Sequence, residues 1–369
     1  MRLLQKECGK CLRHPFLWIV CITFGLFQFL SIYTYVGNAG MRKELRQMHV
    51  AVTDEETASP EYESAYADYK KTYGGMYDTL DMHKILEQKE KKSGYEPQGV
   101  WGSWIVRNYD RLQKRVEQIR KTGEGTYAFY PGSWYKLHST LYGKLWKKLI
   151  LQTAVLMILS MLYLMDYERI YKTQDLVLAT TTGKKMMEKK MLAGTLCGLF
   201  YAGLLTVFTL LVFFAAVPFQ NLWHVPVAAC MVAEPRLQMM YPFVTFWRLE
   251  QWRYFLLALV VLVGLLGIIA AVTAAVQLFL QNSYFSFAVL GLLFMGAYLL
   301  AYVQMGNVWD LIREFFNPTV LYATSGGWFM ENDLCLSFAG NEFAVLFCSG
   351  TAAVCLMAVG KRRYHRLEV

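Results

Sequence analysis

The sequence predicts an all-α integral membrane protein with about six transmembrane helices and a large extracytoplasmic helical insert after the first of them. Apolar residues make up 55% of its 369 residues, whereas roughly 45–50% is usual in soluble domains. The charged residues gather in blocks and leave several uncharged stretches of about 20 residues, the length that crosses a bilayer as a helix. Positive charges flank these stretches, so the net charge of +9 indicates membrane orientation and not nucleic-acid binding.

The segment 1–15 is predicted to be a cytoplasmic amphipathic helix on the membrane surface. Cys8-Gly9-Lys10-Cys11 has the C-x-x-C spacing of redox and zinc sites, but it lacks the second ligand pair that a structural zinc needs. The helical pattern explains the segment better, because its two faces separate. The apolar face carries Leu4, Cys8, Cys11 and Leu12, and the basic face carries Arg2, Lys6, Lys10 and Arg13.

The transmembrane helices are predicted from the uncharged runs. The first, 16–36, follows Pro15 and is too long for the apolar core of a secretory signal peptide, so we expect a retained helix. Only Gln281-Asn282-Ser283 separates the fourth span from the fifth, which predicts a tight helical hairpin. The second span is 149–165, and spans three to six, within 191–360, are Met191 to Val217, Phe255 to Leu280, Tyr284 to Met305 and Phe343 to Gly360.

The distribution of Lys and Arg predicts the orientation. The N-terminal tail, the loop 166–190 and the tail 361–369 carry fourteen of them, whereas the loops Pro218 to Tyr254 and Gly306 to Glu342 carry four. Since short cytoplasmic loops are enriched in positive charge, we expect a multi-pass protein of the cell membrane with both termini in the cytoplasm. The insert 37–148 then faces outward, and loops longer than about 60 residues are exempt from the charge rule.

The insert is predicted to be a helical domain. One helix is marked by tyrosines at steps of three and four residues, which share a face, and a second by Leu112, Val116 and Ile119. The two would pack as an antiparallel hairpin. The tyrosines form either its core or a stripe that contacts a substrate, and the aromatic run from Tyr127 to Tyr135 is expected at the membrane interface. The tyrosines are Tyr62, Tyr66, Tyr69, Tyr73 and Tyr77.

Motifs of enzymes and of ion-driven pumps are missing from the sequence. It has no G-x-x-x-x-G-K-[ST] phosphate loop, no H-E-x-x-H motif and no ligand spacing among its six histidines. The predicted spans lack acidic and basic residues, which disfavours ion-coupled transport. We therefore expect no catalytic residue, cofactor site or metal site in this chain. Cys230 and Cys335 are the cysteines of the two outer loops, and a disulfide between them is a hypothesis.

The loop 166–190 is the most informative stretch. It begins with Asp166-Tyr167-Glu168-Arg169, continues with the apolar Leu176-Val177-Leu178 and reaches the third span through Thr180-Thr181-Thr182-Gly183-Lys184-Lys185. An apolar cluster between charged flanks predicts a short helix that docks onto a partner, and the Thr-Thr-Thr-Gly break separates it from the next helix. The alternative is a surface elbow that lies on the lipid headgroups.

This loop resembles that of the permease subunits of bacterial ABC exporters of the type-2 class. The resemblance rests on Tyr167-Glu168-Arg169, Leu176 and Leu178, Thr182-Gly183-Lys184-Lys185, and Lys189 or Lys190. It implies a permease that exports a peptide, an antibiotic, a lipid-like molecule or an ion, paired with a second permease as a homodimer or heterodimer. It also implies a separate ATP-binding cassette ATPase, the subunit that binds ATP and Mg, docked on this loop and on the N-terminal helix. The residues that would contact the ATPase are Tyr167, Glu168, Arg169, Leu176, Val177, Leu178, Thr182, Gly183, Lys184 and Lys185.

A second hypothesis belongs to a different class of function. The chain would be a non-transporting membrane sensor or scaffold, whose extracytoplasmic domain binds a ligand and signals through the same loop. This hypothesis predicts no ATPase partner. A neighbouring gene for an ATP-binding cassette subunit would favour export, and a histidine kinase alone would favour sensing.

Overall fold

The structure, a computed structural model, confirms an all-α membrane protein. Within the part of the chain that it describes, β-structure is limited to two isolated bridges, Pro226 with Glu250 and Thr245 with Met330. The described residues are 2–38, 42, 64, 67, 71, 75–93, 99–126, 137–173, 183–217, 219, 222–231, 244–303, 309–331 and 338–367.

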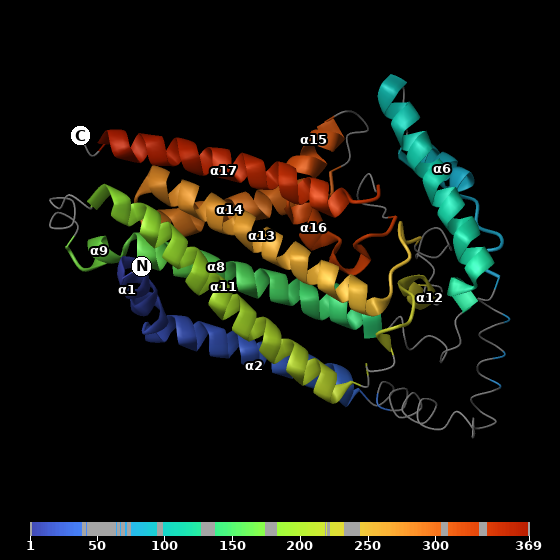
Figure 1. The fold of residues 1–369 in the computed structure, drawn as a ribbon, viewed down its shortest axis with the longest axis horizontal. Helices are drawn as coiled ribbons and strands as arrows, with labels where there is room; N and C mark the ends of the chain where they lie inside the picture. Colours follow the sequence, from blue (N-terminus) through green and yellow to red (C-terminus); the bar gives the residue numbers. More distant parts are fainter. Residues whose placement is uncertain are drawn as a thin grey trace.

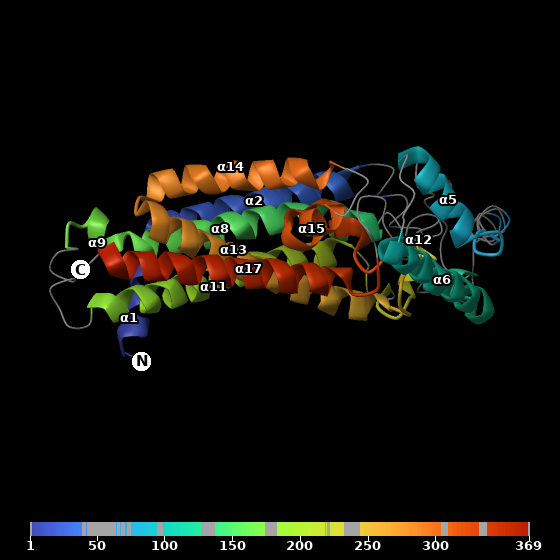
Figure 2. The same ribbon diagram turned by 90° about the horizontal axis from the view of Figure 1, so that it is seen from above.

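Six helices in the described ranges are long and apolar enough to cross a membrane. They lie side by side with their axes roughly parallel in one bundle (Figures 1 and 2). The second begins with a π-helical segment, η2 (Ser139–Leu145), that continues directly into α8. The six are α2 (Pro15–Gly37), η2 with α8 (Trp146–Met165), α11 (Gly183–Ala216), α13 (Gln251–Leu280), α14 (Ser283–Ala301) and α17 (Asn341–Leu367).

Several helices extend past the uncharged runs that predicted them. Helix α11 begins at Gly183, and α17 continues to Leu367. The runs end at the first charged residue, but the helix does not. A charge beyond the run is either paired, as Lys190 is with Glu168, or exposed to water, as Arg362 is. The hairpin between α13 and α14 is confirmed: Gln281 has a φ of 51°, and the Asn282 side chain accepts hydrogen bonds from the backbone N–H of Tyr284 and Phe285.

Helix α8 lies at the centre of the bundle and is its most buried span. It packs against α11, where small residues allow close contact. A Cβ on Gly194 would lie 2.9 Å from Met161 Sδ, and one on Gly198 would lie closer still to Met157. The sequence predicts close approach at Gly194, Gly198 and Gly203. The first two predictions are confirmed. The prediction at Gly203 is wrong, because apart from its own stretch of helix no described atom lies within 4 Å of the position of its Cβ.

The two ends of the bundle carry different structures. The described parts of the N- and C-terminal segments lie at one end, together with α1 (Arg2–Leu12) and α9 (Tyr167–Ile170), and α1 runs across the bundle there (Figure 1). We call this the termini end. The insert lies at the opposite, domain end, together with the short helix α12 (Val227–Met231). The shorter helices α15 (Trp309–Phe316), α16 (Thr319–Ala323) and η4 (Ser325–Gly327) connect α14 to α17.

The described part of the insert is a helical hairpin of α5 (Met82–Ser93) and α6 (Gly99–Thr122), followed by the turn η1 (Glu124–Thr126). Leu112, Val116 and Ile119 are buried on α6, as predicted. Tyr77 is not on a helix: it lies in the same turn as Gly75, and glycines interrupt helical patterns. Tyr62, Tyr66, Tyr69, Tyr73 and the run 127–135 lie outside the described residues.

Candidate functional site

The predicted partner-binding residues that the structure describes lie at the termini end. Tyr167, Glu168 and Arg169 form α9, which directly follows α8. Gly183 begins α11, and the side chains of Lys184 and Lys185 lie outside the described part. The remaining predicted residues, Leu176, Val177, Leu178 and Thr182, also lie outside it.

Glu168 is the centre of a buried ion cluster. The residue is 6% exposed, and its carboxylate accepts a hydrogen bond from Lys10 Nζ at 3.1 Å and forms an ion pair with Lys190. Lys10 belongs to α1 and Lys190 to α11. One side chain of a four-residue helix therefore joins two segments that are distant in sequence.

The Glu7 carboxylate and the Tyr167 ring also contact Lys10 in this cluster. Lys10 Nζ also donates to Glu7 Oε1 at 2.6 Å and lies 4.5 Å from the centroid of the Tyr167 ring. Glu7 and Lys190 are both buried. The two carboxylates and two ammonium groups cancel in formal charge, as buried charges require. We call Glu7, Lys10, Glu168 and Lys190 the termini-end ion cluster.

The cysteines of the C-x-x-C motif help to seat α1 on α11. Cys11 is buried, its carbonyl accepts a hydrogen bond from Tyr201 Oη at 3.4 Å, and Cys197 Sγ lies 3.8 Å from the Cys8 carbonyl. Burial raises the pKa of the Cys8 thiol to about 11, so little thiolate forms at neutral pH. These thiols pack as small apolar groups. In the described ranges, no group of three or more His, Cys, Asp or Glu side chains is placed to hold a metal ion.

The elbow between α8 and α9 also contacts the α13–α14 hairpin. Asp166 Oδ2 accepts a hydrogen bond from Ser283 Oγ at 2.8 Å, and Ser283 Oγ lies 3.3 Å from the Leu162 carbonyl. A displacement of α9 would therefore act on α1 and α11 through Glu168, and on the hairpin through Asp166.

The outer face of α9 is exposed while its inner face is anchored. Arg169 is exposed, and Ile170 and Tyr171 are 56% and 53% exposed. In the turn that follows, Lys172 has a φ of 54°, a left-handed backbone conformation that is strained for residues other than glycine. It closes with a hydrogen bond from Thr173 N to the Glu168 carbonyl at 2.8 Å. The structure thus places a cation and two large apolar side chains on a small projecting surface.

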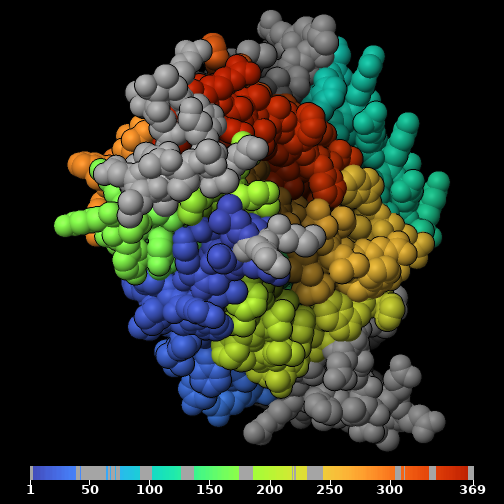
Figure 3. Space-filling view, turned by 60° about the vertical axis from the view of Figure 1, so that its left-hand side comes forward, coloured from blue at the N-terminus to red at the C-terminus, as the bar shows by residue number. Residues whose placement is uncertain are grey.

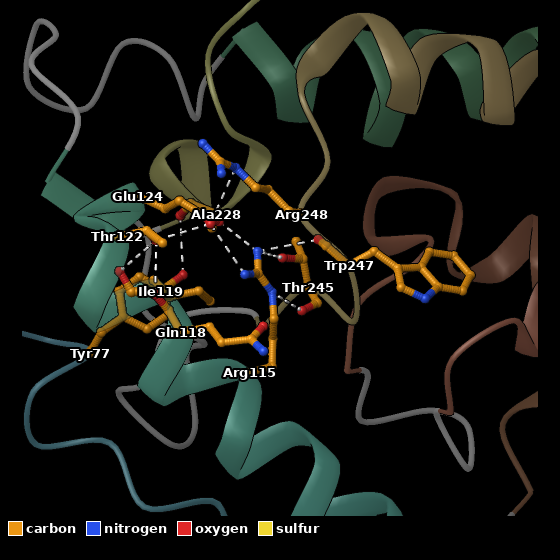
Figure 4. A network of polar contacts seen from close by, with 10 residues as sticks. All are labelled: Tyr77, Arg115, Gln118, Ile119, Thr122, Glu124, Ala228, Thr245, Trp247 and Arg248. Atoms are coloured by element: carbon orange, nitrogen blue, oxygen red, sulfur yellow. Dashed lines mark hydrogen bonds and ion pairs between the residues drawn. The ribbon is translucent and has the colours of Figure 1, made fainter.

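A second buried ion cluster lies at the domain end (Figure 4). Arg115 of α6 donates to both carboxylate oxygens of Glu124, at 3.2 and 2.5 Å. It also donates to the carbonyls of Thr245 and Trp247, at 3.2 and 3.3 Å, in the segment that leads into α13. Arg248 lies 3.6 Å from Glu124 on the outer side. We call Arg115, Glu124, Thr245, Trp247 and Arg248 the domain-end ion cluster.

Other contacts join the insert to the outer loops. Tyr77 Oη donates to the Ala228 carbonyl of α12 at 3.1 Å. Glu331, which is buried, pairs with Lys89 of α5 and lies 3.4 Å from Tyr109 Oη of α6. The insert is therefore attached to segments that lead directly into α13 and α17. These pairs could not be predicted from the sequence, because their members lie far apart along the chain.

A polar and aromatic cluster beneath the insert was also not predicted from the sequence. His138 lies 3.3 Å from Gln251 Oε1, and its ring centroid is 4.6 Å from that of Tyr142 and 5.0 Å from that of Tyr254. Burial lowers the pKa of His138 to about 4, so the imidazole is neutral at physiological pH. Cys230 is a free, buried thiol that accepts from Gln251 Nε2 at 3.1 Å, so the structure does not contain the disulfide with Cys335; Cys335 lies outside the described residues.

Three comparisons with known proteins place no relative beside this chain: no family model matches it, and neither a curated protein nor a solved structure does. The class of the protein therefore follows from its own architecture. It is a multi-pass helical membrane protein, and its six apolar helices fit a membrane transporter.

Proposed function

We propose that the chain is the permease subunit of an ATP-binding cassette exporter, with its termini end in the cytosol and α9 as part of the surface on which a separate ATPase subunit docks. The single observation that carries this proposal is the construction of α9. Its inner side chain, Glu168, is buried and paired with two helices, while Arg169, Ile170 and Tyr171 point outward. A surface patch that must transmit force needs this combination of an exposed contact face and a fixed root.

The proposed mechanism follows from the connections of the ion cluster. Closure of the ATPase subunits on ATP would press on α9 and on the segment 174–182. Glu168 would pass the displacement to α1, and so to α2, and to α11, while Asp166 passes it to the α13–α14 hairpin. Helices that shift as rigid elements in this way can alternate access to the two sides of a membrane. ATP and Mg would bind only to the partner, and a second permease would complete the path.

Two variants of the docking surface test the proposal. An ATP-binding cassette ATPase subunit should copurify with the chain, and Arg169→Glu should lower ATP-driven transport at least tenfold while the protein still inserts. A triple alanine change at Leu176, Val177 and Leu178 should do the same. The matched control is Arg362→Glu, which reverses an exposed cation on α17 at the same end. Full coupling of ATP hydrolysis in both variants would contradict the proposed docking surface.

The absence of any ATPase partner would instead favour the sensor or scaffold. In that case the attachment of the insert to the outer loops would be its signalling contact. Copurification with a histidine kinase, unaffected by Arg169→Glu, would then be the expected result.

A further inference from the structure

A groove at the termini end lies beside the ion cluster but is not explained by it. It has a volume of about 690 Å³ and separates α1 from the last turn of α8 and from α9. Figure 3 views this end of the molecule, with α1 and the start of α2 in blue next to the green of α8 and α9. Its lining consists of Gln5, Lys6, Gly9, Lys10, Arg13, His14, Pro15, Tyr163, Tyr167 and Tyr171.

The charge of the lining is one-sided. Lys10 is neutralised by the ion cluster, but Lys6 and Arg13 are exposed, and neither has an ion-pair partner in the part of the chain that the structure describes. Among the described residues that line the groove, none is acidic. The groove therefore attracts an anion, and three tyrosines on its opposite wall offer hydroxyl groups and ring faces.

The position of the groove indicates which kind of molecule carries the anionic group. Its wall contains Pro15, the first residue of span α2, and Tyr163, which lies in the last turn of span α8. Phe16, which follows Pro15, and Ile19, one turn further along α2, are 50% and 60% exposed, so they would contact the lipid chains of a bilayer that α2 spans. A groove at the ends of two spans lies at the depth of the headgroups, where tyrosine and basic residues are enriched and where basic pockets between helices bind anionic lipids.

We propose that this groove binds the phosphate group of an anionic phospholipid, with Lys6 and Arg13 as the charge partners and the acyl chains along α2. The site requires only that α2 and α8 span a bilayer, and it is independent of the proposed ATPase partner. The lipid would fill the space between α1 and α9 beside the termini-end ion cluster. An acidic segment of a protein partner is the competing occupant. Such a segment would not explain why the groove lies next to the exposed apolar surface of α2.

Gly9 provides a variant that fills the groove without disturbing the fold. No described atom lies within 4 Å of the position that its Cβ would occupy. Gly9→Ala should therefore be tolerated and even stabilise α1, because glycine is a poor residue inside a helix. Gly9→Leu should project a larger side chain into the groove and exclude the lipid, whereas Gly9→Ala leaves room for it.

The test uses the full chain, delipidated in detergent, with binding measured by native mass spectrometry. Phosphatidylglycerol should bind, whereas phosphatidylcholine and inorganic phosphate should not. Lys6→Gln or Arg13→Gln should weaken binding about fivefold, and the double variant about 30-fold. Gly9→Leu should abolish binding, and Gly9→Ala should keep it. The matched control, Lys189→Gln with Arg362→Gln, removes two exposed cations at the same end, outside the groove.

Three results would overturn the proposal. Equal loss of phosphatidylglycerol in the control pair would show attraction by bulk charge only. Displacement of phosphatidylglycerol by millimolar inorganic phosphate would show a site for free phosphate. Unchanged lipid binding in Lys6→Gln/Arg13→Gln, together with loss of ATPase copurification, would show that the groove holds a protein segment. Failure of ATPase copurification alone would leave the lipid site intact and would count against the proposed function.

Discussion

Both ends of the bundle hold a buried ion cluster, and the two clusters differ in their cation. At the domain end, Arg115 presents a planar fork, and its donors reach a carboxylate and two carbonyls. At the termini end, Glu168 lies between Lys10 and Lys190, whose ammonium groups are point charges on flexible stems. Arginine holds a fixed geometry that lysine does not require. We therefore expect the domain-end contact to be rigid, whereas the termini-end contact can stay paired while its helices move.

We expect the largest effect from a substitution that breaks the domain-end ion cluster. Among the described residues, Arg115→Met leaves the buried Glu124 with Arg248 and Thr122 as side-chain partners, and removal of one partner from a buried pair costs about 3–5 kcal/mol. We expect a lower free energy of unfolding in mixed micelles and new protease cleavage in the insert. Arg120→Met is the control: its pair with Asp78 is exposed, so the change should have little effect. Equal stability of the two variants would refute the rigid attachment.

Removal of one charge from the termini-end ion cluster should lower the free energy of unfolding by less. Glu168→Gln leaves Lys10 and Lys190 without their shared carboxylate, but a lysine can extend toward water. We expect a loss of about 2–3 kcal/mol. Combining it with Lys190→Gln in a double-mutant cycle should give a coupling energy of about 1–3 kcal/mol. A coupling near zero would show that the ion pair between α9 and α11 does not form.

The third expectation concerns pH at the domain end. His138 has a pKa of about 4 in the fold, against about 6.5 in an unfolded chain. Between these values the unfolded chain binds a proton that the folded protein does not, so stability falls as pH drops from 6.5 to 4, by up to about 3 kcal/mol. His138→Gln should flatten this dependence, and His83→Gln, in an exposed pair with Asp110, should not. An unchanged slope in His138→Gln would place the titration elsewhere.

The smallest expected effect concerns the turn after α9. Lys172 holds a φ of 54°, where glycine is free of strain. Lys172→Gly should stabilise the fold by about 1 kcal/mol, whereas Lys172→Ala should not. The readout is the melting temperature in detergent. Destabilisation by glycine would argue against the left-handed turn and the fixed position of α9.

The spans were predictable because an uncharged run of about 20 residues has few alternatives to a membrane helix. The hairpin at Asn282 and the buried face of α6 were predictable for the same local reasons. The partners of Glu168 were not predictable, because they come together only through tertiary packing. Gly194 and Gly198 let α11 pack closely on α8, and Cys8 and Cys11 pack α1 onto α11, which brings α1 to Glu168. Tyr77 was misassigned because the spacing of three and four residues between the tyrosines continues past Gly74 and Gly75, whereas Tyr77 lies in a turn. Arg115 was indistinguishable in sequence from the other basic residues of α6.

The proposed function requires α9 to lie in the cytosol and the insert to lie outside. Single cysteines placed at two exposed sites, Arg169→Cys on α9 and Lys84→Cys on α5, test this arrangement with a membrane-impermeant maleimide. Labelling above that of the parent chain is expected only at position 84 in intact cells, and at position 169 only after permeabilisation. Labelling of position 169 in intact cells, with position 84 protected, would contradict the orientation and the proposed coupling role of α9.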